Sequence, residues 1–244
     1  MTDDHDPYRH HPNLRGKIDD PEASFLRTFS NKVMEELADK HGLPKGWWYS
    51  DDQREALRAR VLDGRWGRDL WVFAYGSLMW DPAIHFAEVR RARIDGYARR
   101  FILLDENGAR GTCEAPGLFA ALDAGSRCDG LVFRIAADVL DTETRILWQR
   151  EQIAPGYNAV FLPADVGDGT VEALAFVADC DAANVRPDLT HAMQVDCIAT
   201  GAGVLGTSAD YLRGIVEKLD ELGIDDAATR TLMADVDARL AKAG

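Results

Sequence analysis

The stretch WVFAYGSLMW, from Trp71 to Trp80, begins as an apolar run and breaks at Tyr75-Gly76-Ser77 before it becomes apolar again. The apolar run predicts a buried strand from Leu70 to Ala74. A glycine just past a strand end can turn the chain sharply and leave consecutive amides exposed, and such amides can hold a carboxylate or an oxyanion. A plain turn is the alternative. The GxGxxG and GxxxxGK(S/T) patterns are absent here, so neither a dinucleotide nor an ATP phosphate is indicated.

The chain beyond this strand predicts an α+β fold, a small mixed or antiparallel β-barrel with flanking helices. One helix is expected within the strand-rich core, from about Ala137 to Glu151, and three more are expected near the end of the chain. The further strands, which bring the total to about six, are expected at Val89–Leu104, Leu118–Asp123, Gly130–Ile135, Asn158–Leu162 and Val171–Asp179, and the late helices at Asp188–Thr200, Ser208–Leu222 and Asp226–Ala241.

The N-terminal part of the chain, residues 1–66, is expected to form a tail and a helical extension, separate from the domain at residues 67–244. About 20 charged, aliphatic-poor residues open the chain and predict a mobile tail outside the fold. Helical spacing predicts a helix from about Ser30 to Lys40. A second short helix is expected over DDQREALRARVLD, with Asp51 or Asp52 as its cap.

Composition limits the partners of the chain. The 41 acidic residues outnumber the 28 Lys and Arg, and the net charge of −13 weighs against nucleic acid or an anionic membrane. No apolar run of about 18 residues and no apolar leader appear, which predicts a cytoplasmic protein without membrane segments. The four cysteines lack CxxC spacing and the histidines lack HxxH pairing, so we expect reduced, buried cysteines and neither a metal nor another cofactor.

Two further stretches carry residues suited to chemistry. In ARGTCEAPGLF, three loop formers surround Arg110, whose planar fork suits a carboxylate; the alternative is a surface loop in which Glu114 neutralises it. In WQREQIAPGY, Pro155 ends the helix so that Glu151 lies in its last turn. The helix dipole and burial would raise the pKa of Glu151 toward that of a general base, with Arg150 opposing. A surface glutamate is the alternative.

Ser77 invites comparison with a hydrolase nucleophile, but the GxSxG elbow is not present. Taken in order, VFAYGSLMW, RGTCEAPG, REQIAPGY and GVLGTSADYL resemble the ChaC-like gamma-glutamylcyclotransferase family over roughly Trp71 to Ile224. The resemblance implies that family's barrel and release of 5-oxoproline from a gamma-glutamyl peptide, usually glutathione. It implies Glu151 as the catalytic residue and a substrate-binding loop made of Val72, Phe73, Ala74, Tyr75, Gly76, Ser77 and Leu78.

The sequence departs from the family pattern at Ala74, Cys113 and Pro155, which leaves strict glutathione specificity open. The resemblance suggests that the substrate's own α-amine attacks its γ-carbonyl while Glu151 carries the proton. Arg110, Tyr157 and Tyr211 are expected at the pocket wall. Two alternatives stay open: a cyclotransferase of other gamma-glutamyl amino acids or amines, and a non-enzymatic protein that binds a carboxylate ligand or regulates a cation transporter.

Overall fold

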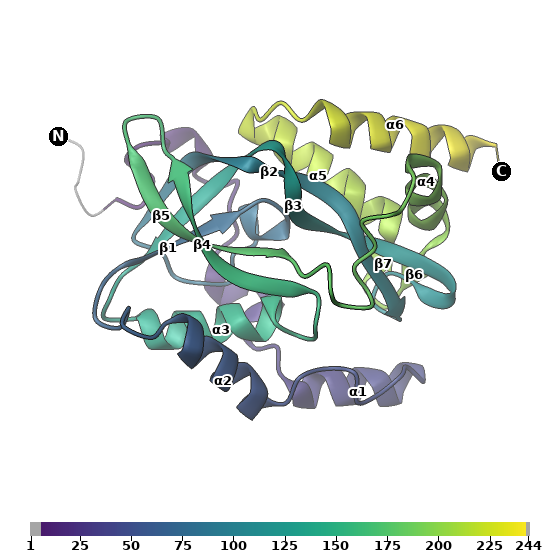
Figure 1. The fold of residues 1–244 in the computed structure, drawn as a ribbon, viewed down its shortest axis with the longest axis horizontal. Helices are drawn as coiled ribbons and strands as arrows, with labels where there is room; N and C mark the ends of the chain where they lie inside the picture. Colours follow the sequence, from purple (N-terminus) through teal and green to yellow (C-terminus); the bar gives the residue numbers. More distant parts are fainter. Residues whose placement is uncertain (1–5, 243–244) are drawn as a thin grey trace.

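A closed five-stranded barrel forms the centre of the molecule (Figure 1). The computed structural model describes residues 6–242. The barrel order is β1-β3-β2-β4-β5, and β1 closes it by pairing in parallel with β5 while the neighbouring strands pair antiparallel. The predicted small mixed β-barrel is therefore confirmed. The strands are β1 (Leu70–Ala74), β2 (Glu88–Asn107), β3 (Thr112–Ile135), β4 (Tyr157–Asp165) and β5 (Thr170–Ala178).

The barrel has five strands where about six were predicted, because the expected strands at Leu118–Asp123 and Gly130–Ile135 are two parts of β3. The small and polar residues between them, 124–127, are exposed and resemble a loop in sequence. The β2–β3 register shifts between Asp95 and Tyr97, with Gly96 at φ +82°. A bulge of this kind bends a strand without ending it. Two short strands, β6 (Ala202–Gly203) and β7 (Gly206–Thr207), pair outside the barrel.

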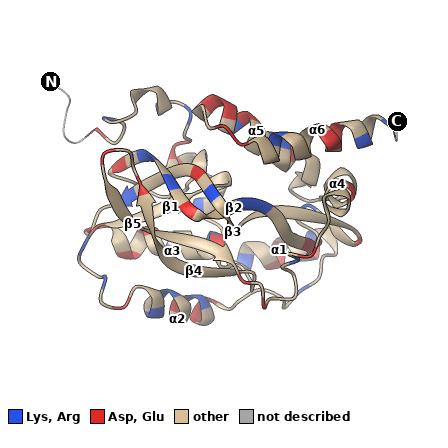
Figure 2. Ribbon diagram, turned by 45° about the horizontal axis from the view of Figure 1, so that its top comes forward, with Lys and Arg blue, Asp and Glu red and all other residues tan. Residues whose placement is uncertain are grey.

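Helices cover two sides of the barrel, with α1, α2 and α3 on one side and α4, α5 and α6 on the other (Figure 1). The cap of α2 is Ser50, which forms a capping box with Gln53, so the expected cap at Asp51 or Asp52 is wrong. Figure 2 shows acidic and basic residues interspersed along α2. The helices are α1 (Asn31–His41), α2 (Asp51–Val61), α3 (Leu140–Glu151), α4 (His191–Thr200), α5 (Ser208–Leu222) and α6 (Ala227–Ala241).

The core lies inside the barrel and under α3. Phe73 of β1, Phe133 of β3 and Phe176 of β5 are almost fully buried. Trp148 of α3 packs edge to face on Phe176, with 5.5 Å between the ring centroids. This contact fixes the C-terminal half of α3 against the barrel, and aromatic pairs of this kind add to the area that they bury.

The N-terminal segment packs against the barrel, so the mobile tail predicted for the first 20 or so residues is wrong from residue 6 onward; residues 1–5 lie outside the described range. Leu14 is fully buried and Ile18 is 6% exposed. The amide of Val89 donates to the Pro7 carbonyl at 2.9 Å. The segment is rich in charged residues, so the sequence did not mark Leu14 and Ile18, four residues apart, as core residues. The division of the chain at residue 66 stays a prediction.

The cysteines and histidines gather into no metal site among residues 6–242. Cys128 is buried as expected, but Cys113 and Cys180 are exposed and Cys197 is half-buried, so the expected burial is wrong for these three. Within the same range, no helix is both long and apolar enough to cross a bilayer.

Leu14→Ala tests the packing of the N-terminal segment. Loss of a fully buried leucine should lower the free energy of unfolding by about 2 to 5 kcal/mol in denaturant titrations. Leu240→Ala, at a side chain 38% exposed on α6, serves as the matched control and should change it by no more than about 0.5 kcal/mol. Equal effects of the two substitutions would contradict the packing.

Candidate active site

The loop after β1 does not fold as its glycine suggested. Gly76 has φ −125° and ψ −138°, so it does not use the left-handed region that glycine favours. A Cβ at Gly76 would lie 3.6 Å from the Tyr211 hydroxyl, which is ordinary contact. The chain then enters a 3-10 turn over Ser77–Met79. The first amides of such a turn have no acceptor within it, and those of Gly76, Ser77 and Leu78 bond to none of the described residues.

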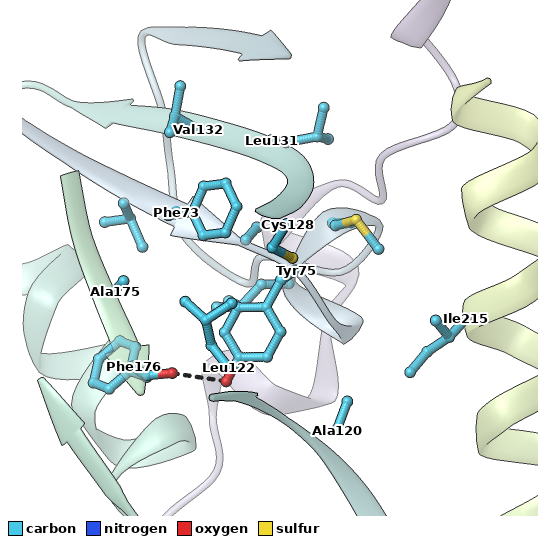
Figure 3. Close-up of a cluster of buried hydrophobic side chains, with 14 of the residues drawn as sticks. Phe73, Tyr75, Ala120, Leu122, Cys128, Leu131, Val132, Ala175, Phe176 and Ile215 are labelled. Carbon is cyan, nitrogen blue, oxygen red and sulfur yellow. Dashed lines mark hydrogen bonds between the residues drawn. The ribbon is translucent and has the colours of Figure 1, made fainter. Parts of the chain in front are cut away.

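The side chains of the predicted loop divide between core and site. Val72, Phe73 and Ala74 are fully buried in β1, and Leu78 is 5% exposed. Their contribution is to hold the loop in place. Tyr75 is also buried, and its hydroxyl donates to the Phe176 carbonyl at 2.8 Å, as Figure 3 shows.

Arg150 joins this loop to Glu151, the last residue of α3. Its Nε donates to Glu151 Oε1 at 2.8 Å and its Nη2 donates to Ser77 Oγ at 2.9 Å. Nη1 donates to the Asp81 carbonyl at the end of the same loop. The Arg150 side chain is only 3% exposed, whereas that of Glu151 is 17% exposed. Glu151 is thus held by a buried cation and stays open to a ligand. Sequence reasoning considered Arg150 only for its charge.

The carboxyl of Glu151 titrates above its ordinary range, as predicted. Burial raises its pKa, and the charge and hydrogen bond of Arg150 oppose that rise. A carboxylate raised in this way takes up a proton more readily near neutral pH than a surface glutamate does. The alternative of a plain surface glutamate is therefore wrong.

Three tyrosines lie near enough to Glu151 for its charge to act on them. The Tyr157 hydroxyl donates to the Ala120 carbonyl at 2.8 Å, and the Tyr211 hydroxyl accepts from the Ala120 amide at 3.4 Å. Burial raises the pKa of Tyr211 to about 12, and it raises those of Tyr75 and Tyr157 well above their ordinary value. The negative charge of Glu151 raises the pKa values of all three tyrosines further. The hydroxyls therefore stay protonated at neutral pH and can donate hydrogen bonds.

The tyrosines gather here because this part of β3 lacks a neighbouring strand on one side. β1 covers only Leu131–Ile135, and farther along β3 pairs on that side only at Leu122, with Val177 of β5. The backbone amides and carbonyls of an unpaired strand edge need other hydrogen-bond partners. Ser208 Oγ accepts from the Leu118 amide at 3.0 Å and donates to its carbonyl at 3.2 Å. Sequence reasoning gave Ser208 no role, and no capping signal marks it, because the cap of α5 is Thr207, whose side chain accepts from the Asp210 amide at 2.9 Å.

Arg110 lies in the β2–β3 hairpin turn beside the ring of Tyr211, with 5.2 Å between its Cζ and the ring centroid. Its Nη1 donates to the Thr207 carbonyl at 3.0 Å. Among residues 6–242, no carboxylate lies within 4 Å of this guanidinium, and Glu114 is exposed, so the alternative in which Glu114 neutralises it is wrong. Burial lowers the pKa of Arg110, which remains a cation at neutral pH.

Two surface hollows lie apart from these residues. One of about 210 Å³ lies between α2 and α3, over Arg54 and Trp148. The other, of about 260 Å³, lies over the outer face of the barrel beside Trp71 and Phe161. Neither is lined by Glu151 or the three tyrosines. The perturbed, mutually interacting groups around Glu151 are the better candidate for an active site.

Comparison with known proteins gives one consistent result. The family model described as ChaC-like protein matches residues 70–239. The chain is 35% identical over 196 residues to the "Glutathione-specific gamma-glutamylcyclotransferase" of Escherichia coli, covering 80% of this chain and 84% of that one. It is 29% identical over 178 residues to the human "Glutathione-specific gamma-glutamylcyclotransferase 1", covering 69% of this chain and 78% of that one.

Solved structures support the same fold. The crystal structure of a yeast gamma-glutamylcyclotransferase specific to glutathione superposes with a TM-score of 0.62 at 20% identity, over 70% of this chain and 99% of that one. Its selenomethionine-labelled form gives the same TM-score at 18% identity, over 96% of its length. At this identity the likeness concerns the fold alone. The match over residues 70–239 and the extent of the bacterial relative together place the chain in the ChaC-like family.

Proposed function

We propose that this protein is a glutathione-specific gamma-glutamylcyclotransferase, a lyase that converts glutathione to 5-oxoproline and Cys-Gly. The observation that carries the proposal is the bridge from Glu151 through Arg150 to Ser77, which holds a proton acceptor beside a loop with free amides. The relatives in Escherichia coli and human carry this activity in their names. The partner is a small-molecule peptide, and a cytoplasmic location remains a prediction.

The reaction follows from the chemistry of the substrate. Its α-amine must be neutral to attack the γ-carbonyl carbon, and an ordinary α-amine has a pKa of about 8. Glu151 accepts the proton of the amine as the new carbon–nitrogen bond forms. It then returns the proton to the departing nitrogen as the old amide bond breaks. The nucleophile belongs to the substrate, so no covalent enzyme intermediate is required, and holding the γ-glutamyl arm in a folded geometry supplies much of the rate.

The developing oxyanion needs donors that are already in place. The amides of Gly76, Ser77 and Leu78 and the protonated hydroxyl of Tyr211, which only accepts a hydrogen bond within the described residues, offer them near Glu151. The hydroxyl hydrogens of Tyr75 and Tyr157 are already donated to backbone carbonyls. Donors fixed in this way contribute most where water is excluded. Ser77 serves as a contact of Arg150 and not as a nucleophile. The non-enzymatic alternatives need no carboxylate of raised pKa, and no feature of this site favours them.

Glu151→Gln should lower kcat for 5-oxoproline release by about 10²- to 10⁴-fold, because the amide keeps the shape and cannot accept the proton. The assay is chromatographic detection of 5-oxoproline and Cys-Gly from glutathione. Glu217→Gln, an exposed glutamate on α5, is the matched control and should leave turnover unchanged. Near-normal turnover by Glu151→Gln would overturn the mechanism.

Arg150→Gln should move the acid limb of the kcat/KM profile to higher pH. Arg150 opposes the burial that raises the pKa of Glu151, so its removal raises that pKa further and leaves the base protonated over more of the range. The substrate amine titrates identically in both proteins and cancels in the comparison. Arg145→Gln, five residues earlier on α3 with a side chain 51% exposed, is the control. An activity loss equal at every pH would show that Arg150 acts only on structure.

A further inference from the structure

The guanidinium of Arg110 has more hydrogen-bond donors than the protein uses. An arginine side chain offers five N–H donors, and within residues 6–242 this one makes a single hydrogen bond, to the Thr207 carbonyl at 3.0 Å. Its Nε is buried without any partner. Asp105, a nearby acid, is engaged by the turn amides of Asn107 and Arg110. Asp210, the other, pairs with Arg213 at 3.1 Å.

The hairpin that carries Arg110 is held rigidly. The amides of Val204 and Leu205 donate to the Gly108 and Ala109 carbonyls at 2.9 and 2.8 Å, so the loop between β6 and β7 clamps the turn. Gly203 permits this approach, because a Cβ there would lie 2.3 Å from the Gly108 oxygen. A cation fixed in place with unused donors is prepared for an anionic ligand, since little side-chain freedom remains to be lost on binding.

Tyr211 interacts with both Arg110 and Glu151. The Arg110 guanidinium lies beside the ring of Tyr211, and the Tyr211 hydroxyl shares the Ala120 backbone with the Tyr157 hydroxyl. The charge of Glu151 acts on Tyr211 and Tyr157, whereas the groups that act on Arg110 are Tyr211, Asp210 and Asp105. Glu151 and Arg110 both act on Tyr211, so a ligand with one end at Glu151 can extend along Tyr211 to Arg110.

We infer that Arg110 binds the C-terminal carboxylate of the leaving peptide, which in glutathione is the glycine carboxylate. The inference rests on the proposed function, since the α-amine of the substrate must lie at Glu151 for ring closure. The opposite end of an extended tripeptide then points toward the hairpin. A planar guanidinium pairs with a carboxylate through two parallel hydrogen bonds, so Arg110 selects peptides that end in a free carboxylate at this distance.

The experiment compares glutathione with its C-terminal glycinamide, γ-Glu-Cys-Gly-NH₂, in the wild type and in Arg110→Gln, with 5-oxoproline as the common product. The wild type should prefer glutathione by about 10- to 100-fold in kcat/KM, the range expected for a hydrogen bond to a charged group. Arg110→Gln should lose that factor on glutathione, mainly through KM, and change little on the amide. Arg110→Lys keeps the positive charge but cannot form two parallel hydrogen bonds. Its kcat/KM for glutathione should lie between those of the wild type and Arg110→Gln.

Arg239→Gln, an arginine of α6 with a side chain 41% exposed, is the matched control and should keep the wild-type preference. Equal kcat/KM for the two peptides in the wild type would overturn the inference without reference to any variant. So would an equal loss on both peptides in Arg110→Gln, which is the pattern expected if Arg110 contacts the γ-glutamyl end. Failure of the folded wild type to release 5-oxoproline from either peptide would instead reject the proposed function, and the inference with it.

Discussion

The buried guanidinium of Arg150 is the contact on which the site depends. It connects the Glu151 carboxylate, the Ser77 hydroxyl and the Asp81 carbonyl, so a helix end and the loop after β1 become one unit. A buried arginine is costly unless its donors are satisfied, and here each of its three nitrogens has an acceptor. The position of Glu151 is therefore set by the same bonds that keep Arg150 stable.

This arrangement requires that α3 dock firmly, and the N-terminal segment contributes to that docking. Arg27 forms two hydrogen bonds with the buried carboxylate of Glu143, at 2.8 and 3.0 Å, and Arg58 reaches Asp141 at 2.7 Å. The amide of Tyr49 donates to the Ile153 carbonyl at 2.8 Å, two residues past Glu151. Residues outside the family match at 70–239 thus hold both ends of the helix that carries Glu151.

The opposite wall of the site follows from a constraint on strand pairing. β1 is five residues long and leaves part of β3 without a neighbour. The backbone groups there that lack a strand partner bond instead to the hydroxyls of Ser208, Tyr157 and Tyr211. A short strand in a closed barrel thus leaves unpaired backbone groups on β3, and these groups fix the hydroxyls of Tyr157 and Tyr211.

Local patterns in the sequence were enough to predict the barrel, the strand from Leu70 to Ala74 and the helix from Ser208 to Leu222, because period and caps act over a few residues. The direction of the Glu151 pKa shift was also predicted, but burial raises that pKa, and burial is decided by the tertiary structure. The four motifs in order were enough to indicate the family. Tertiary structure alone decided that Arg150 contacts Ser77, 73 positions away, that Tyr75 turns into the core, and that Leu14 anchors the N-terminal segment. These outcomes depend on which groups come into contact when the barrel closes, and the spacing of residues along the chain does not specify contacts between distant segments.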